Sequence, residues 1–323
     1  MDMWHRGAVV RAGSVFLRDR FCRHRGNRSR SARCQLWPGE RHPPGAGPAQ
    51  ASAAAPASAC PCRSFRPGRQ AAPEWKGAWD WQIGASSDSA VLVPAGVTLM
   101  DLDGFTTSAT KVAELRGKGV YTLCYINAGS YEPWRPDSAQ YPGYLKIGQD
   151  PDWPDESFLD VTDVFKPGSV LATILVNRMR MCKSKGFDAL EPDNLQNDEN
   201  VPGGRITAQQ QLDFNGWIAD RAHENGLAVF QKNGPDKVLQ RDRTGKMMVD
   251  KFDGILNEQC QEFGECGPLA EYTRRGKLAL NVEYRRSVAL DCTSFLASGV
   301  NAIKKDLGLK GATMSGYLRE SCN

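Results

Sequence analysis

The sequence predicts an α/β fold, a single (β/α)8 barrel that follows an N-terminal tail, and three observations support this prediction. Short apolar runs alternate with segments of helical spacing from residue 75 onward. Eight of these runs fit the strand number of a barrel. The same part has no internal repeat and no obvious break between domains, and its roughly 250 residues can bury one large core.

The eight expected strands are apolar runs, most of which end in polar residues. They cover residues 79–85, 97–105, 121–129, 186–194, 227–234, 252–260, 277–285 and 309–317. An open doubly wound sheet is the alternative, but it usually carries a glycine-rich phosphate-binding turn after a strand. No expected strand is followed by such a turn, because Gly203 and Gly204 form an isolated pair in a loop.

Helical spacing between the strands supports the barrel. It predicts one helix over residues 107–118 and a second one around Ile174, Leu175, Met179 and Cys182. Thr207 and Gln210 form a capping box for a third helix, which stops at Gly226. A long polar loop is expected between the third strand and the second helix.

The composition of residues 1–72 predicts a disordered extension, and residues 73–323 are expected to form the catalytic domain. The first 70 residues contain thirteen Arg, no Lys and three acidic residues. Their Arg/Ala/Pro-rich composition buries too little surface to offset the entropy lost on folding. A basic nucleic-acid patch at residues 18–33 and a start codon placed too far upstream are the alternatives. These arginines are not regularly interleaved with aromatic residues, so we expect no nucleic-acid partner.

The remainder of the chain is acidic, with 28 basic and 34 acidic residues after residue 70 and a net charge of −6. No apolar run approaches the roughly 18 residues that span a bilayer, so we expect no membrane segment. The tail also lacks the apolar stretch of a secretory signal. Localisation therefore has to be argued from the cysteines.

Six cysteines in the folded part predict disulfide bonds. An even number of cysteines with a single histidine, His223, fits disulfides better than zinc, whose sites use paired Cys-x-x-Cys spacings. Reduced and buried cysteines are the alternative. We favour the pairs Cys124 with Cys182, Cys260 with Cys266, and Cys292 with Cys322. These bonds would place the domain outside the cytoplasm.

Polar residues end almost every expected strand. They are Asp101, Asp103, Asn127, Glu191, Asp193, Asn194, Lys232, Asn233, Asn257, Glu258, Glu283 and Tyr284. In a parallel barrel all of these ends open onto one face, which is the face that carries active sites. A ring of six carboxylates with amides and one lysine is therefore expected.

Three kinds of chemistry could use this ring. A metal-dependent hydrolase would need several histidines, and His223 lies within a helical segment, so we expect no metal. A Schiff-base lysine at Lys232 lacks a supporting phosphate loop, and no cofactor is expected. Paired carboxylates that flank a sugar also explain the aromatic residues near the strand ends, which can stack on pyranose rings or simply pack. These are Trp79, Trp81, Tyr125, Tyr131, Trp134, Trp153 and Tyr284.

The motifs resemble those of glycoside hydrolase family 114, the endo-α-1,4-polygalactosaminidases or spherulin-4-like TIM-barrel proteins. They are WDWQIGA, LMDLDGF, CYINAGSYEPWRPD, PDWPDESFLD, GFDALEPDN, QKN, ILNEQCQEFGEC and VEY, in this order over residues 75–323. The resemblance implies hydrolysis of an α-1,4-linked galactosamine polymer by Asp193 and Glu258. The basic tail and the lack of a clear signal peptide depart from the family pattern.

We expect a retaining, endo-acting mechanism in which Asp193 is the nucleophile and Glu258 the acid and base. Substrate binding is expected from Asp101, Asp103, Glu191 and Glu283, with Arg135 and Asp137 shaping the cleft. Further substrate-binding candidates are Trp81, Tyr125, Asn127, Asn194, Lys232, Asn233 and Tyr284. The expected partner is a cationic galactosamine-containing polysaccharide, and the expected form is a secreted or wall-associated monomer. A non-catalytic carbohydrate-binding barrel and a hydrolase of another α-galactan are the alternatives.

Overall fold

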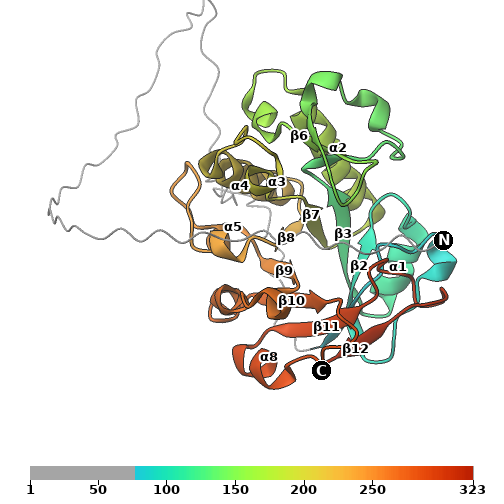
Figure 1. Ribbon diagram of the computed structural model, residues 1–323. Helices are drawn as coiled ribbons and strands as arrows, with labels where there is room; N and C mark the ends of the chain where they lie inside the picture. Colours follow the sequence, from blue (N-terminus) through green and yellow to red (C-terminus); the bar gives the residue numbers. More distant parts are fainter. Residues whose placement is uncertain (1–76, 323) are drawn as a thin grey trace, which may run out of the picture. The chain divides into compact units, whose positions relative to one another are not determined.

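The computed structural model describes residues 77–322. Within this range, eight parallel strands and a ninth antiparallel strand form a nearly closed barrel in the order β1-β2-β3-β7-β8-β9-β10-β11-β12 (Figure 1). The strand bounds are β1 Ala78–Trp81, β2 Val97–Asp103, β3 Tyr121–Asn127, β7 Ala189–Asp193, β8 Ala228–Lys232, β9 Gly254–Glu258, β10 Leu278–Glu283, β11 Asn301–Lys305 and β12 Arg319–Ser321. The predicted tail of residues 1–72 lies outside the described residues.

Side chains join β1 to β11, where the barrel closes. The indole Nε1 of Trp79 donates to the carbonyl of Asn301 at 3.0 Å. The amide of Asn301 donates to the carbonyl of Gly77 at 2.8 Å. The ammonium of Lys305 donates to Asp80 Oδ1 at 2.8 Å, and both of these side chains are fully buried. These bonds connect the first and the last parallel strand.

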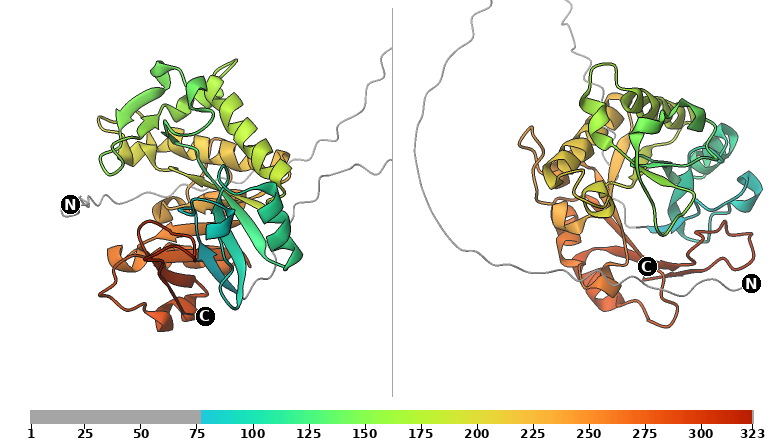
Figure 2. Two further views of the ribbon diagram at one scale, coloured as in Figure 1. Left: turned by 90° about the vertical axis from the view of Figure 1, so that its right-hand side faces the viewer. Right: turned by 45° about the horizontal axis from the view of Figure 1, so that its top comes forward.

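The helices lie outside the strands, as two further views show (Figure 2). The longer ones are α1 Ala109–Gly117, α2 Val170–Lys185, α4 Ala208–Glu224 and α8 Cys292–Ser298, and the short ones are α3 Asn197–Asn200, α5 Met248–Lys251, α6 Cys260–Phe263 and α7 Ala270–Thr273. The predicted capping box of Thr207 and Gln210 begins α4, and Gly186 in a left-handed conformation ends α2. The predicted helices are confirmed.

A small antiparallel sheet lies between β3 and α2, where the sequence predicts only a polar loop. It consists of β4 Ser130–Tyr131, β5 Lys146–Gln149 and β6 Ser157–Leu159, in the order β4-β6-β5. β6 lies in the upper part of Figure 1. Its strands have two to four residues, which is too short for a periodic pattern to predict them.

The predicted eighth strand at residues 309–317 is wrong, because this segment forms turns. Leu309 and Gly316 there have φ angles of 45° and 82°. The eighth parallel strand is β11, whose sequence NAIKK is more polar than that of an ordinary buried strand. Lys304 forms an ion pair of 3.0 Å with Glu320, and Lys305 binds Asp80, so both lysines are buried. The ion pairs with Glu320 and Asp80 allow a buried strand to form although its sequence is polar.

The core has two layers, as strand alternation requires. Side chains inside the barrel include Leu99, Leu123, Phe230, Leu256 and Leu280. The second layer packs between the strands and the helices. No helix within residues 77–322 is long and apolar enough to cross a membrane.

All three predicted disulfide bonds are present. Cys124 of β3 is bonded to Cys182 of α2, which ties a strand to its covering helix. Cys260 and Cys266 close a short loop directly after β9. Cys292 at the start of α8 is bonded to Cys322 near the end of the chain.

Candidate active site

Lys232 lies at the centre of the predicted ring of polar strand ends. Its Nζ is 2.8 Å from Asp193 Oδ1, 3.1 Å from Glu258 Oε2 and 3.4 Å from Glu191 Oε1. These carboxylates belong to the ends of β7 and β9, the two strands that pair with β8. Three adjacent strands therefore bring together four charged side chains that are distant in the sequence.

The chain turns in the same way after each of these strands. Asn194, Asn233 and Gln259 directly follow Asp193, Lys232 and Glu258, and they have φ angles of 61°, 50° and 59°. A left-handed conformation costs a non-glycine residue roughly 1 kcal/mol, and this cost is tolerated most easily by asparagine. Such strained residues cluster at functional sites.

Asp193 is held in its ionised form. Tyr125 Oη donates to Asp193 Oδ2 at 3.0 Å, and the backbone N–H of Asn194 donates to Oδ1 at 2.9 Å. Burial raises the pKa of Asp193, but the charge of Lys232 and these hydrogen bonds outweigh it. The pKa of Asp193 therefore lies below its ordinary value, and the carboxylate is available as a nucleophile.

Glu258 accepts hydrogen bonds from two neutral side chains. Tyr284 Oη donates to Oε1, and Asn233 Nδ2 donates to Oε2 at 2.9 Å. The backbone N–H of Glu258 donates in turn to Asn233 Oδ1 at 2.8 Å. Asn233 thus holds both the backbone and the carboxyl group of Glu258 in one orientation.

Asp193 and Glu258 are the members of the cluster that a ligand can reach. Their side chains are 23% and 24% exposed, whereas those of Lys232 and Glu191 are 4% and 0% exposed. One carboxylate oxygen of each contacts the same lysine nitrogen, at 2.8 and 3.1 Å. One oxygen of each carboxylate therefore lies within ion-pair distance of a single nitrogen, which places the two carboxylates side by side.

Three predicted residues lie beneath this pair, namely Trp81, Asp101 and Glu191. All three are almost completely buried. The pKa of Glu191 is raised to about 8, mainly by burial. The negative charges of Asp193 and Glu258 also raise this pKa, whereas the positive charge of Lys232 lowers it. Burial and the charge of Glu191 also raise the pKa of Asp101 well above its ordinary value. The ring of Trp81 lies 4.9 Å from the ammonium of Lys232.

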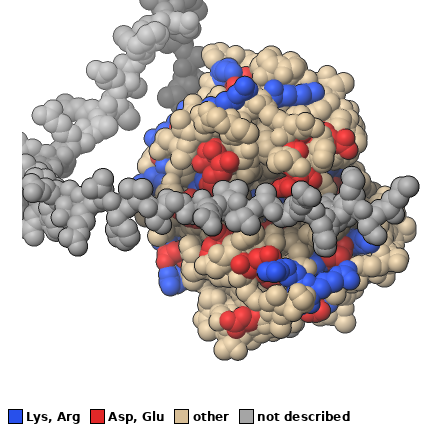
Figure 3. Space-filling model, viewed as in Figure 1, with Lys and Arg blue, Asp and Glu red and all other residues tan. Residues whose placement is uncertain are grey.

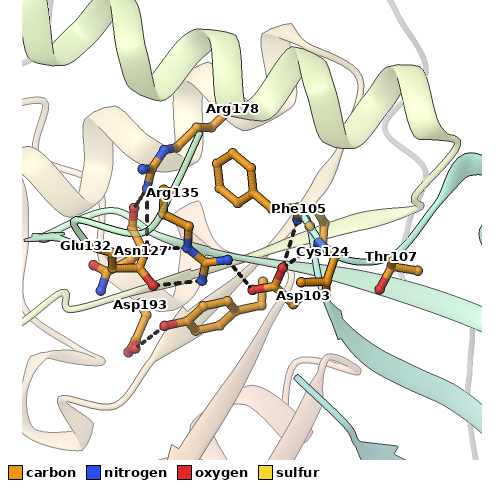
Figure 4. A network of polar contacts seen from close by, with 12 residues as sticks. Asp103, Phe105, Thr107, Cys124, Asn127, Glu132, Arg135, Arg178 and Asp193 are labelled. Atoms are coloured by element: carbon orange, nitrogen blue, oxygen red, sulfur yellow. Dashed lines mark hydrogen bonds and ion pairs between the residues drawn. The ribbon is translucent and has the colours of Figure 1, made fainter. Parts of the chain in front are cut away.

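Asp103 and Arg135 belong to a second network, which Figure 4 shows together with Arg178. Asp137 joins this network through Arg178. Arg135 donates to Asp103 Oδ2 at 2.6 Å and to both oxygens of Glu132, at 2.8 and 2.7 Å. Arg178 binds both oxygens of Asp137 at 2.8 Å. The polar groups of the three predicted residues are therefore engaged within the protein, and their substrate-binding roles stay predictions.

Glu132 and Arg178 were not among the predicted site residues. A signal for Arg178 is present in the sequence, because it lies four residues from both Ile174 and Cys182 on the apolar face of α2. A charge on a buried face requires a partner. Glu132 lies in an irregular segment after β4, where no periodic pattern identifies it.

A third group links the small sheet to the site. Asn194 Nδ2 donates to Asn127 Oδ1 at 3.2 Å, and Asn127 Nδ2 donates to Glu156 Oε2 at 3.0 Å. Burial raises the pKa of Glu156 to about 8, and the charges of Glu132 and Asp193 add to this effect. Glu156 was also missing from the predicted residues, although it lies in the segment PDWPDESFLD.

Glu283 does not lie in the Lys232 cluster. Its neighbours Leu280 and Val282 point into the barrel, so alternation directs Glu283 outward. Its Oε1 accepts hydrogen bonds from the backbone N–H of Gln261 at 2.8 Å and from Asn281 Nδ2 at 2.9 Å. The side chain supports the loop after β9.

His223 contacts Asp253 at 2.8 Å on the outside of the barrel, away from the cluster. Among residues 77–322, no group of three or more His, Cys, Asp and Glu side chains is arranged to hold a metal ion.

Comparisons with known proteins agree with this architecture. The model of glycoside-hydrolase family GH114 matches residues 62–323. The fold is similar to that of Aspergillus fumigatus Ega3 in complex with galactosamine, with a TM-score of 0.63 and 23% identity over 76% of this chain and 95% of that chain. It is also similar to the glycoside hydrolase domain of PelA from Pseudomonas aeruginosa, with a TM-score of 0.53 and 12% identity over 76% and 97% of the two chains. No curated protein sequence matches the chain significantly.

Proposed function

The chain belongs to glycoside-hydrolase family GH114, and from this premise we propose that it cleaves α-1,4-linked galactosamine polymers internally with retention of configuration. The observation that carries the proposal is the contact of Asp193 and Glu258 with the same lysine nitrogen. Ega3, whose fold is similar, has been crystallised with galactosamine. A galactosamine unit is therefore the ligand to test first.

Asp193 attacks the anomeric carbon, and Glu258 protonates the leaving oxygen. Glu258 then removes a proton from water, which releases the sugar from Asp193. Lys232 supports the first step because its charge keeps Asp193 ionised. Tyr284 and Asn233 support both steps because they hold the carboxyl group of Glu258 in place.

The charge of the domain favours a cationic polymer. The chain has a net charge of −6 after residue 70. On the face shown in Figure 3, acidic side chains form several separate groups among the basic ones. A net negative charge attracts a polymer of protonated amino sugars and has little effect on an N-acetylated one.

We infer that the protein acts outside the cytoplasm. Three disulfide bonds support this assignment, since such bonds persist mainly in oxidising compartments.

A reducing-end assay tests the activity with three polymers: deacetylated polygalactosamine, its N-acetylated form and an α-galactan. We expect rapid formation of mixed oligomers from the deacetylated polymer alone. Proton NMR of the first products should show the α-anomer, as retention requires. Cleavage of the α-galactan alone would assign another substrate. Binding of the polymers without any cleavage would favour a carbohydrate-binding barrel instead.

A further inference from the structure

A buried glutamine, Gln231, precedes Lys232 on β8 but points away from the Lys232 cluster. Phe230 belongs to the interior core, so strand alternation directs Gln231 outward, toward the helices. There Tyr272 of α7 donates from its Oη to Gln231 Oε1 at 2.8 Å. Burial raises the pKa of Tyr272 well above its ordinary value, which keeps this side chain a phenol and a donor. A buried hydrogen bond thus joins the strand to its covering helix.

The amide nitrogen of Gln231 fixes the turn that follows β8. Its Nε2 donates to the carbonyl of Asn233 at 2.8 Å and to the carbonyl of Gly234 at 2.9 Å. These two residues have φ angles of 50° and 62°, so two successive residues adopt the left-handed conformation. That conformation is unfavourable for a residue with a side chain, even for asparagine. A single amide group therefore holds both carbonyls of a strained turn.

The same turn carries the side chain that orients Glu258. The backbone N–H of Asn233 donates to the carbonyl of Leu256 on β9 at 3.0 Å. The Asn233 side chain donates to Glu258 Oε2 at 2.9 Å and accepts from the Glu258 backbone N–H at 2.8 Å. Every polar group of Asn233 therefore has a partner on β9 or in Gln231. A change in the conformation of this turn would move the amide that orients the carboxyl group of Glu258.

We propose that Gln231 and Tyr272 are positioning residues that fix the orientation of Glu258 through Asn233. The inference rests on the proposed function for the role of Glu258 and extends the site to two residues outside the barrel interior. Their side chains are 1% and 0% exposed, so neither can reach a sugar and both must act through the turn. A displacement of about 1 Å in a catalytic group can cost about a hundredfold in rate, so such remote residues can determine kcat.

Gln231→Met tests the inference, because it keeps the length of the side chain and removes the three hydrogen bonds of the amide group. With deacetylated polygalactosamine we expect kcat to fall about tenfold and KM to change less than about twofold. A second reaction, of the dinitrophenyl glycoside of a galactosamine oligomer with azide, needs no acid or base. Dinitrophenolate leaves without a proton, and azide displaces Asp193 from the anomeric carbon without losing one. In this reaction the variant should stay within about twofold of wild type.

A milder variant and a matched control accompany this test. Tyr272→Phe removes only the hydroxyl group that anchors Gln231, and it should show the same selective loss at a smaller size, about threefold in kcat on the polymer. Gln211→Met makes the same substitution at another buried glutamine, which donates to Asn215 within α4 at 2.8 Å. This control should affect both reactions equally. Equal losses in both reactions for Gln231→Met and Tyr272→Phe, or no loss in either variant, would overturn the inference.

Amide hydrogen exchange of the full chain, followed by NMR, tests the same link without a substrate. The backbone N–H of Glu258 donates to Asn233 Oδ1, and in Gln231→Met it should exchange at least about tenfold faster than in wild type. The N–H of Thr122, which donates to Asp188 Oδ2 at 3.0 Å, should exchange at an unchanged rate. Unchanged exchange at Glu258 would overturn the inference, even if wild type cleaves the polymer. Faster exchange at Glu258 without any cleavage by wild type would remove the proposed activity and leave the positioning contact in place.

Discussion

The hydroxyl group of Tyr125 donates a hydrogen bond of 3.0 Å to Asp193 Oδ2, while Lys232 contacts the other oxygen, Oδ1, at 2.8 Å. The two donors therefore hold the carboxylate from both sides. A donor to an ionised carboxylate lowers its pKa, and Tyr125 has this effect on Asp193.

Tyr125→Phe should accordingly raise the pKa of Asp193. The acid limb of the kcat/KM profile should move to higher pH, and kcat should fall about tenfold while the fold is retained. Tyr121→Phe is the matched control, because Tyr121 lies on the same strand and its hydroxyl group has no hydrogen-bond partner among the described residues. An unchanged acid limb in Tyr125→Phe would show that this bond does not tune the nucleophile.

Asp193→Asn and Glu258→Gln test the catalytic pair directly. Each keeps the side-chain shape and removes the nucleophile or the acid, so cleavage should fall by orders of magnitude with little change in melting temperature. If Glu258→Gln kept more than about a tenth of wild-type turnover, a loss below roughly 1.4 kcal/mol, the assignment of the acid would be wrong. Glu191 would then be the next candidate.

Lys232→Met tests the central cation. Removing one partner of a buried ion pair leaves uncompensated carboxylates and typically costs about 3 kcal/mol of unfolding free energy. The pKa of Asp193 should rise, because the charge of Lys232 is the strongest influence that lowers it. Lys118→Gln, which removes a solvent-exposed pair with Glu114, should leave the midpoint of urea denaturation almost unchanged. Equal losses in the two variants would contradict the central role of Lys232.

The strands with an apolar sequence could be predicted. A strand whose polar residues are buried by ion pairs with distant residues could not. Strands such as β3 and β9 have apolar runs that end in a polar residue, so the sequence predicts where they lie and that their polar ends open onto one face. β11 contains Lys304 and Lys305, and only their pairing with Glu320 and Asp80 explains their burial. Such distant partners cannot be inferred from local pattern.

The gathering of the strand-end residues of the candidate site was predictable for the same reason, whereas the direction in which Glu283 points was not. Asp193, Lys232 and Glu258 end neighbouring parallel strands, and the topology brings them together. Glu283 also ends a strand, but the two-residue alternation directs it outward. Glu156 comes from the segment before β6 and reaches Asn127 across an irregular connection, so no periodic pattern could assign it.

The disulfide bond between Cys260 and Cys266 should matter more for catalysis than for stability. It closes a loop with a sequence separation of 6, whereas Cys124 and Cys182 are separated by 58 residues. Loop-closure entropy then gives about 2 kcal/mol for the short loop and about 4 kcal/mol for the long one. The short loop begins directly after Glu258 and Gln259, so its loss should loosen the catalytic acid.

Replacing both cysteines of each pair by serine separates these effects. The variant without Cys260 and Cys266 should melt closer to wild type but lose about tenfold in kcat, with little change in KM. The variant without Cys124 and Cys182 should lose more stability in urea denaturation. If the short-loop variant kept full kcat, the loop would have no part in positioning Glu258, and Asn233 with Tyr284 would suffice to hold it.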